Sequence, residues 1–191
     1  ESDYNPYVLF DVAKSSLNPG KIPNEELWEY IANVLPYYQK EFGIDYNVIV
    51  CAMRHFDEKD NYEMLKAAHD FLGHGVCAAD LAGAEALFPT SDYKDLFTYS
   101  AQQGVPYVIH AGEAAGPESM WAAIQMGAAR IGHGIAAVQD EKLMEYLKEH
   151  DIPLEVCVTS NVQTKGAASY EEHPILKMEE TDCIMKIPKK T

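Results

Sequence analysis

Short apolar runs recur along the chain, and most are followed by a stretch whose apolar residues have helical spacing. Five runs are largely apolar without alternation, and they cover residues 48–53, 75–79, 107–109, 130–132 and 154–158. A sixth candidate covers residues 7–10. Such runs are typical of strands that are buried on both faces, as in a parallel sheet. The pattern therefore predicts parallel strands.

Helices are predicted between these strands. One begins near Pro23 and has an apolar stripe that comprises Leu27, Ile31, Leu35, Tyr38 and Phe42. Another is expected to be capped by Asp140 and to bury Leu143, Met144 and Leu147. Further helices are predicted over residues 61–71, 93–103 and 117–126. Repeated strand–helix units indicate an α/β fold, either a barrel or an open doubly wound sheet.

Polar residues collect directly after the predicted strands: Asp80, His110, Glu113, His133, Ser160 and Asn161. In a barrel these positions all open onto the mouth where active sites are built. The chain has neither a Gly-x-Gly-x-x-Gly turn nor a phosphate loop ending in Gly-Lys-Ser/Thr. The pattern therefore favours a barrel-type active site over a nucleotide-binding sheet.

Two strand ends carry a histidine next to glycine. In the first, His110-Ala-Gly-Glu113, small residues would let a ligand approach the backbone, although the same residues could simply cap a loop. In the second, His133 lies between Gly132 and Gly134, which would expose its imidazole. The other histidines are interpreted as structural or solvent-exposed: His55, His69, His74, His150 and His173.

The charge of the chain excludes some partners. A formal net charge of -15 argues against a nucleic acid or an anionic membrane, because both bind a basic face. No apolar run reaches the roughly 20 residues of a membrane span. The basic cluster at residues 186–190 is interpreted as a solvated tail. The charge leaves a neutral small molecule as a partner.

The four cysteines are far apart and form no Cys-x-x-Cys pair, which argues against a Cys-rich zinc site. Three of them lie in predicted strands, so buried thiols in a reducing, cytoplasmic compartment are expected.

Five segments, taken in order, resemble the adenosine deaminase family. They are residues 51–55 (Cys-Ala-Met-Arg-His), 80–83 (Asp-Leu-Ala-Gly), 110–113 (His-Ala-Gly-Glu), 130–134 (Arg-Ile-Gly-His-Gly) and 155–161 (Glu-Val-Cys-Val-Thr-Ser-Asn). Each motif alone is weak, but five in the same order and at similar spacing are specific. The resemblance extends over residues 7–178.

The resemblance implies a (β/α)8 barrel and hydrolytic deamination of adenosine or deoxyadenosine by a zinc-activated water. His110 is similar to a zinc ligand, and Glu113 to the proton donor for the purine ring. His133 is similar to the histidine that orients and deprotonates the water. Gly83 resembles a backbone contact to the purine, with Asp80 in support.

Two family segments have no match in this chain. There is no His-x-His, which in the family supplies two zinc ligands, and no Asn-Thr-Asp-Asp-Pro, which supplies another. We therefore expect a single domain over residues 1–191 that forms a partial barrel, without the first and last strands and with a divergent tail at 179–191. Zinc binding by this chain is expected to be weak or absent. The alternatives are a deaminase completed by segments outside this sequence, a catalytically dead remnant, or a deaminase of another adenine nucleoside.

A partial barrel also predicts self-association. An arc of parallel strands has two unpaired edges and an uncovered inner face. Val50, Val76, Val108 and Val156 lie in its apolar runs, and some of them are expected to face water in a monomer. The prediction is a homo-oligomer that covers the open side of the sheet.

Overall fold

The computed structural model describes residue 33 and residues 36–43 and 47–179. The candidate strand at residues 7–10, most of the helix predicted after Pro23, and residues 180–191 of the tail lie outside these ranges.

The described chain alternates strands and helices. The strands are β1 (Val48–Met53), β2 (Val76–Ala82), β3 (Val108–Ala111), β4 (Arg130–His133) and β5 (Leu154–Glu155). The helices between them are α2 (Glu58–Asp70), α3 (Lys94–Gln102), α4 (Pro117–Met126) and α5 (Glu141–Glu149). Two 3-10 helices are η1 (Thr90–Tyr93) and η2 (Ile135–Gln139), and the last helices are α6 (Val158–Gln163) and α7 (Ile175–Glu179).

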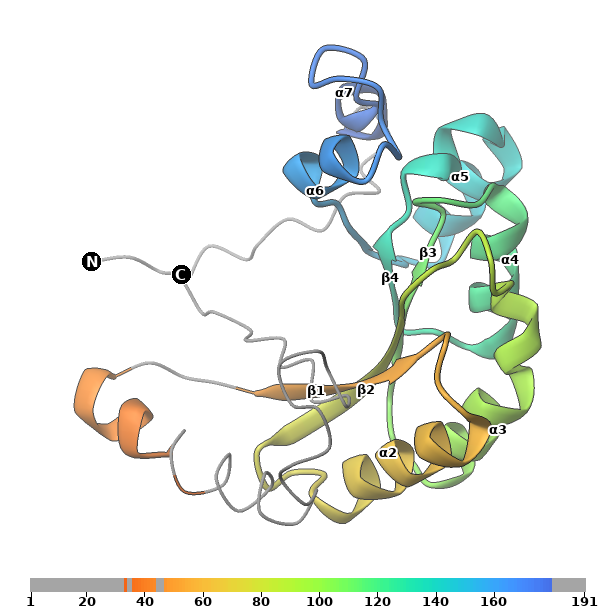
Figure 1. The fold of residues 1–191 in the computed structure, drawn as a ribbon. Coiled ribbons are helices and arrows are strands. Elements are labelled where there is room, and N and C mark those ends of the chain that lie inside the picture. The colour runs from red at the N-terminus through yellow and green to blue at the C-terminus, as the bar shows by residue number, and fades with distance from the viewer. Residues whose placement is uncertain (1–32, 34–35, 44–46, 180–191) are drawn as a thin grey trace.

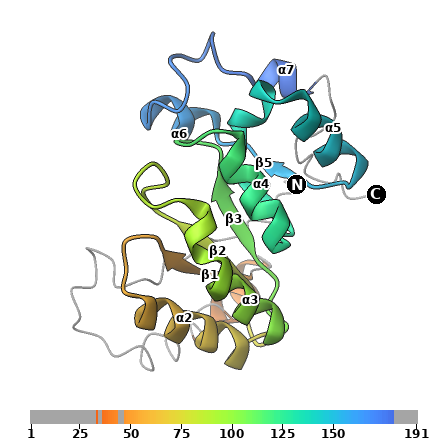
Figure 2. The same cartoon turned by 90° about the vertical axis from the view of Figure 1, so that its right-hand side faces the viewer.

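Neighbouring strands pair in parallel, in their order along the chain. β1 pairs with β2, and β4 pairs with both β3 and β5. A parallel bridge between Ala79 and Tyr107 joins the two groups into one arc. Helices α2 to α5 line one side of this arc (Figure 1), and the view from that side shows them in front of the strands (Figure 2). The predicted α/β class is confirmed, as parallel strands alternating with helices in a partial barrel.

The helix boundaries follow from local sequence signals. Asp140 accepts hydrogen bonds from the backbone N–H groups of Lys142 and Leu143 at 3.0 and 3.3 Å, which confirms the predicted cap of α5. The predicted face of Leu143, Met144 and Leu147 is buried. α4 begins on Pro117 and ends at Gly127, whose φ of 93° is the left-handed conformation common after a helix.

The prediction for the last strand was wrong beyond Glu155. β5 stops there, and Cys157 precedes the first turn of α6, which begins at Val158. The backbone N–H of Asn161 donates to the carbonyl of Cys157 at 2.9 Å, as in a helix. This turn brings the buried amide of Asn161 to polar partners described below. The chain is therefore helical here, although its apolar pattern is that of a strand.

The expectation for the strand valines was also largely wrong. Val50, Val76 and Val108 are 0, 2 and 2% exposed, while Val156 is half-buried. Val50 and Val76 pack in the large core with helix residues such as Leu65, and Val108 packs with Ile49 and Ala78 in a smaller cluster. These four valines therefore leave no large apolar patch exposed to water.

The cysteines are less uniform than expected. Cys51 is buried in β1 and Cys77 is half-buried in β2, but Cys157 is exposed. Cys157 lies outside the strand that was predicted for it, which explains its exposure.

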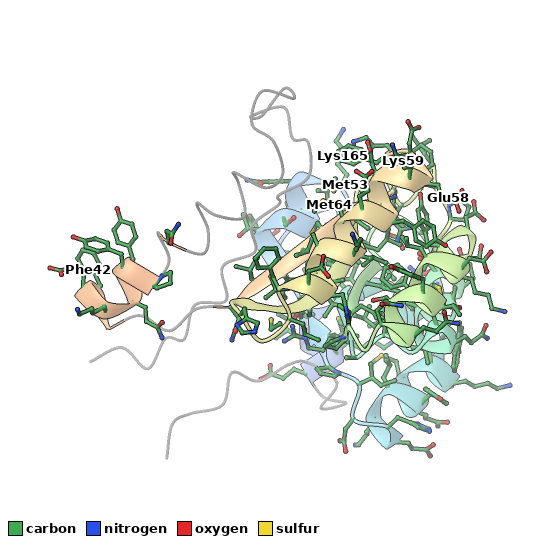
Figure 3. The ribbon with its side chains drawn as sticks, turned by 90° about the horizontal axis from the view of Figure 1, so that it is seen from below. Phe42, Met53, Glu58, Lys59, Met64 and Lys165 are labelled. Atoms are coloured by element: carbon green, nitrogen blue, oxygen red, sulfur yellow. The ribbon has the colours of Figure 1, made fainter. Side chains whose placement is uncertain are left out.

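Residues 36–42 form a helical segment whose aromatic residues are exposed. The exposed fractions of Tyr38 and Phe42 are 49 and 62%, although both were predicted on a buried stripe. Their rings stack on each other at 5.7 Å, and the helix that carries Phe42 lies away from the strands (Figure 3). Among the described residues, the ring contacts of this segment are with one another.

Among the described helices, none is long and apolar enough to cross a membrane.

Candidate active site

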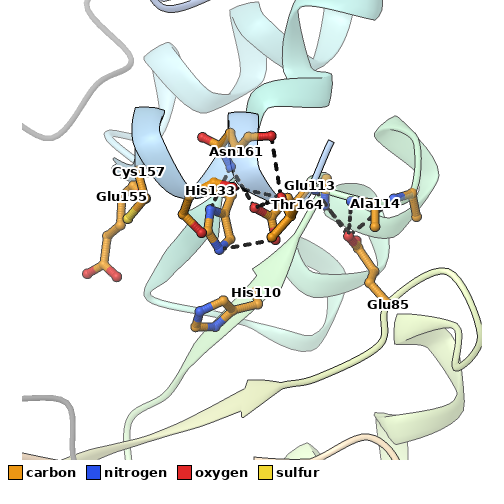
Figure 4. A network of polar contacts seen from close by, with 12 residues as sticks. Glu85, His110, Glu113, Ala114, His133, Glu155, Cys157, Asn161 and Thr164 are labelled. Atoms are coloured by element: carbon orange, nitrogen blue, oxygen red, sulfur yellow. Dashed lines mark hydrogen bonds and ion pairs between the residues drawn. The ribbon is translucent and has the colours of Figure 1, made fainter. Parts of the chain in front are cut away.

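Three strands and one helix bring the predicted polar residues to the same end of the arc. Asp80 lies in β2, His110 in β3 and His133 at the end of β4, while Asn161 lies in α6. Glu113 follows β3 in the loop to α4. Figure 4 shows His110, His133, Glu113 and Asn161 grouped together. The structure confirms the prediction that these side chains meet. They meet because the carboxyl ends of parallel strands lie at one edge of the sheet.

His110 is held by Asp80 from the neighbouring strand. Its Nδ1 lies 2.8 and 3.0 Å from the two carboxylate oxygens of Asp80, which has no exposed surface. The thiol of Cys51 donates to the same carboxylate at 3.4 Å. Burial alone would lower the pKa of His110, but the carboxylate of Asp80 more than reverses this, and the net shift is upward. Within the described residues, Nε2 of His110 has no hydrogen-bond partner.

Gly132 makes room for His110 rather than for its own neighbour His133. A Cβ at position 132 would lie 3.0 Å from Cγ of His110 and 3.1 Å from its Cα. These two positions pair across β3 and β4. The glycine before His133 therefore lets the imidazole of His110 cross the adjacent strand.

His133 has an unusual backbone and a nearly enclosed side chain. Its φ of 62° is rare for a residue with a side chain, and such outliers concentrate at functional sites. Nδ1 lies 2.9 Å from Nδ2 of Asn161, and Nε2 lies 3.4 Å from Oε2 of Glu113. Burial lowers the pKa of His133, opposed in part by the charge of Glu113. The imidazole and that of His110 lie 5.1 Å apart, between ring centroids.

The carboxylate of Glu113 is fixed by α6. Oε1 accepts from Nδ2 of Asn161 and from the hydroxyl of Thr164, both at 2.8 Å. Oε2 is left facing His133. One carboxylate and one imidazole are thus presented side by side, as proton-transfer chemistry requires.

The loop that carries Glu113 is built on a buried carboxylate that the sequence reasoning missed. Glu85 is 6% exposed and accepts the backbone N–H groups of four consecutive residues, 112–115, at 2.6, 3.1, 2.8 and 3.2 Å. It also accepts from the hydroxyl of Ser119. Burial raises the pKa of Glu85, but these donors and the charge of Arg54 outweigh it, so the net shift is downward.

Arg54 supports the other side of the same loop. It is 2% exposed, and one of its terminal nitrogens donates to the carbonyl of His110 at 2.7 Å and to Thr90 at 2.9 Å. The other donates to the carbonyl of Phe88 at 2.7 Å. Desolvation lowers the pKa of Arg54, opposed mainly by the charge of Glu85. Arg54 lies within the matched segment 51–55, and Glu85 follows the segment 80–83 by two residues, but nothing local in the sequence marks either as a support of this loop.

Gly83 lies directly after β2 and needs to be glycine. Its φ is +107°, and a Cβ there would lie 3.4 Å from the backbone nitrogen of Arg54. Asp80, on the strand that Gly83 follows, is directed at His110.

His173 was interpreted as structural or exposed, and it is buried beside the site. It is 5% exposed, and its Nε2 lies 3.1 Å from Oδ1 of Asn161. Burial lowers its pKa. The other four histidines, also predicted to be structural or solvent-exposed, are exposed: His55, His69, His74 and His150.

The described residues do not make a complete metal site. No group of three or more His, Cys, Asp or Glu side chains in residues 33, 36–43 and 47–179 is arranged to hold a metal ion. His110 alone has the form of a zinc ligand, with one ring nitrogen on a buried carboxylate and the other available. Catalytic zinc takes three protein ligands, and the described part of the chain does not bring three such side chains together.

Comparison with known proteins agrees with this geometry. The sequence model of the adenosine deaminase family matches residues 3–188. An adenosine deaminase of Clostridium kluyveri is 39% identical over 182 residues, which cover 95% of this chain and 51% of that protein. One of Haemophilus ducreyi is 47% identical over 133 residues, 68% of this chain and 39% of that protein. The chain belongs to the adenosine deaminase family, and it matches 51 and 39% of the length of these two relatives.

A solved structure extends the likeness to the fold. The adenine deaminase of Arthrobacter aurescens superposes with a TM-score of 0.80 and 25% identity, over 92% of this chain and 53% of that one.

Proposed function

We propose that this chain contributes the acid–base side of an active site for hydrolytic deamination of adenosine or deoxyadenosine, which gives inosine or deoxyinosine. The observation that supports this most directly is the group of Glu113, His133 and Asp80-bound His110 at one end of the arc. Replacing an aromatic amine by water requires an acid that protonates the ring and a group that positions the attacking water. These residues offer both functions.

In this proposal Glu113 gives a proton to N1 of the purine, and His133 orients the attacking water. Gly83 contacts the purine through its backbone, and Asp80 holds His110 in position. Zinc, when bound, supplies a water that is deprotonated near neutral pH. His110 would be one ligand, and the others would come from outside the described residues.

The substrate is a small purine, and the acidic net charge of -15 suits a neutral nucleoside better than a polyanion. The likeness to a protein named adenine deaminase makes the free base the second candidate. A cytoplasmic location is also proposed, because Cys51, Cys77 and Cys157 form no disulfide with one another.

A chimera tests the proposed function. This chain would replace the matching 182-residue segment of the Clostridium kluyveri enzyme, so that the rest of the barrel is supplied. We expect the chimera to convert adenosine to inosine. The reaction is monitored by the loss of absorbance at the adenine band, and adenine and deoxyadenosine are assayed in parallel. A folded, zinc-loaded chimera without turnover of any of the three would favour the catalytically dead remnant instead.

A further inference from the structure

A chain of hydrogen bonds runs from the backbone of α7 to His133. The N–H of Ile175 donates to Nδ1 of His173 at 3.1 Å, and Nε2 of His173 lies 3.1 Å from Oδ1 of Asn161. Nδ2 of Asn161 then lies 2.9 Å from Nδ1 of His133. All three side chains are buried, so water does not compete for these bonds.

The direction of the chain is fixed at its first bond. A backbone N–H can only donate, so Nδ1 of His173 is an acceptor. A neutral imidazole carries a single N–H, which must then be at Nε2 and must donate to Asn161. The oxygen of the Asn161 amide therefore faces His173, and its NH₂ group faces His133.

A second contact fixes the same amide independently. Nδ2 of Asn161 also lies 2.8 Å from Oε1 of Glu113, and a carboxylate only accepts hydrogen bonds. A flipped amide would place two oxygens against each other at this distance, and would place its NH₂ group, a donor, against the N–H of His173. The orientation of Asn161, ordinarily uncertain from geometry alone, is thus anchored on both sides.

The orientation of Asn161 determines the tautomer of His133. Its Nδ1 accepts from Asn161, so in the neutral ring the proton is on Nε2, which faces Oε2 of Glu113 at 3.4 Å. We propose that Asn161 and His173 are positioning residues that hold His133 in the tautomer with its proton on Nε2.

The effect on catalysis rests on the proposed function. In this tautomer Nε2 donates a hydrogen bond to the attacking oxygen and does not accept its proton, which differs from the expectation that His133 deprotonates the water. The carboxylate of Glu113 is then the group beside it that can take the proton. The O–H bond of the water breaks, an O–H bond forms on Glu113, and the same proton passes to N1 of the ring.

The tautomer is measured directly by NMR on the whole chain labelled with ¹⁵N-histidine. Long-range ¹H–¹⁵N correlation at about pH 8, above the ordinary histidine pKa of about 6.5, distinguishes a protonated from a bare ring nitrogen. We expect His133 and His173 to show protonated Nε2 and bare Nδ1. A proton on Nδ1 of His133 would overturn the proposal without any variant being made.

Variants separate positioning from simple packing. His173→Ala should bring the two nitrogen shifts of His133 towards each other, because Asn161 can then turn over, whereas His173→Gln keeps a donor at similar reach and should restore the wild-type pattern. Asn161→Asp, which can only accept, should move the proton of His133 to Nδ1. His150→Ala is the matched control, since His150 is exposed and its side-chain contacts given by the described residues are with Tyr146, one turn earlier in α5.

An unchanged His133 pattern in both His173→Ala and Asn161→Asp would contradict the proposal. If either variant fails to fold, as judged by circular dichroism, the wild-type assignment still decides. The readout needs neither metal nor turnover, so it is independent of whether the chimera deaminates adenosine.

Discussion

Glu85→Gln is the substitution whose cost can be worked out most fully from the structure. Oε2 of Glu85 accepts three backbone N–H groups, and Oε1 accepts the N–H of Gly112 and the hydroxyl of Ser119. Glutamine can keep one oxygen, which is best placed at Oε2. Its NH₂ group then faces the N–H of Gly112, two donors against each other.

The magnitude follows from what is lost. A hydrogen bond to a buried charge contributes about 1.5–3 kcal/mol, and a buried N–H without a partner costs about 1–3 kcal/mol. The buried guanidinium of Arg54 also loses a compensating charge. We expect the free energy of unfolding to fall by about 3 kcal/mol, which for a chain of this size lowers the melting temperature by about 6–12 °C.

The effect should depend on pH in a definite direction. The pKa of Glu85 is lowered in the folded state, so its contribution to stability is present above the unfolded-state pKa of about 4.3 and is lost as the pH falls through the folded-state pKa. The difference between Glu85→Gln and wild type should therefore be largest near pH 7 and shrink in acid.

Urea titration by circular dichroism at several pH values is the assay. Glu118→Gln is the matched control, because Glu118 is exposed and accepts one hydrogen bond, from Gly116 at 3.1 Å. Its expected change is within about 0.5 kcal/mol. If Glu85→Gln stayed in the same range as this control, the loop would not depend on the buried carboxylate, and the reasoning would be refuted.

Three further predictions concern metal and assembly. The chain alone should lose zinc on dialysis and show negligible turnover of adenosine, since the described residues bring no three possible metal ligands together; stoichiometric zinc together with turnover would contradict this prediction. In the chimera, Asp80→Ala should weaken zinc binding by about 10–100-fold, because the carboxylate that orients His110 is lost, and an unchanged affinity by competition with a chelator would argue against it. Sedimentation at micromolar concentration should give a dimer or larger, because β1 and β5 each pair on one side only among the described residues, whereas a well-folded monomer would show that this prediction is wrong.

Much of the fold could be predicted because its signals are local. The cap at Asp140, the apolar face of α5 and the strands at 48–53 and 107–109 each depend on residues within a few positions of one another. The end of β5 could not be predicted in this way, because Val156, Cys157 and Val158 read as a strand. The helical turn there depends on Asn161 meeting Glu113, 48 residues away.

The same distinction between local and distant contacts separates the site residues that could be predicted from those that could not. Asp80, His110 and His133 could be found because parallel strands end at a common edge, which a strand pattern reveals. Glu85 and His173 could not, because their roles depend on partners 27–34 residues away for Glu85 and 12 residues away for His173. A buried carboxylate or imidazole has no local periodicity, and only the packed structure shows what it contacts.

The measurement that tests the central claim most directly compares the chimera with its Glu113→Gln variant. Glutamine keeps the acceptor for Asn161 and Thr164 but cannot carry the proton to the ring, so zinc content should be unchanged. Loss of a general acid lowers turnover by about 10²–10⁴-fold, and we expect kcat for adenosine to fall by this factor. Near-normal turnover in a folded, zinc-loaded Glu113→Gln chimera would contradict the account, because the acid would then lie elsewhere.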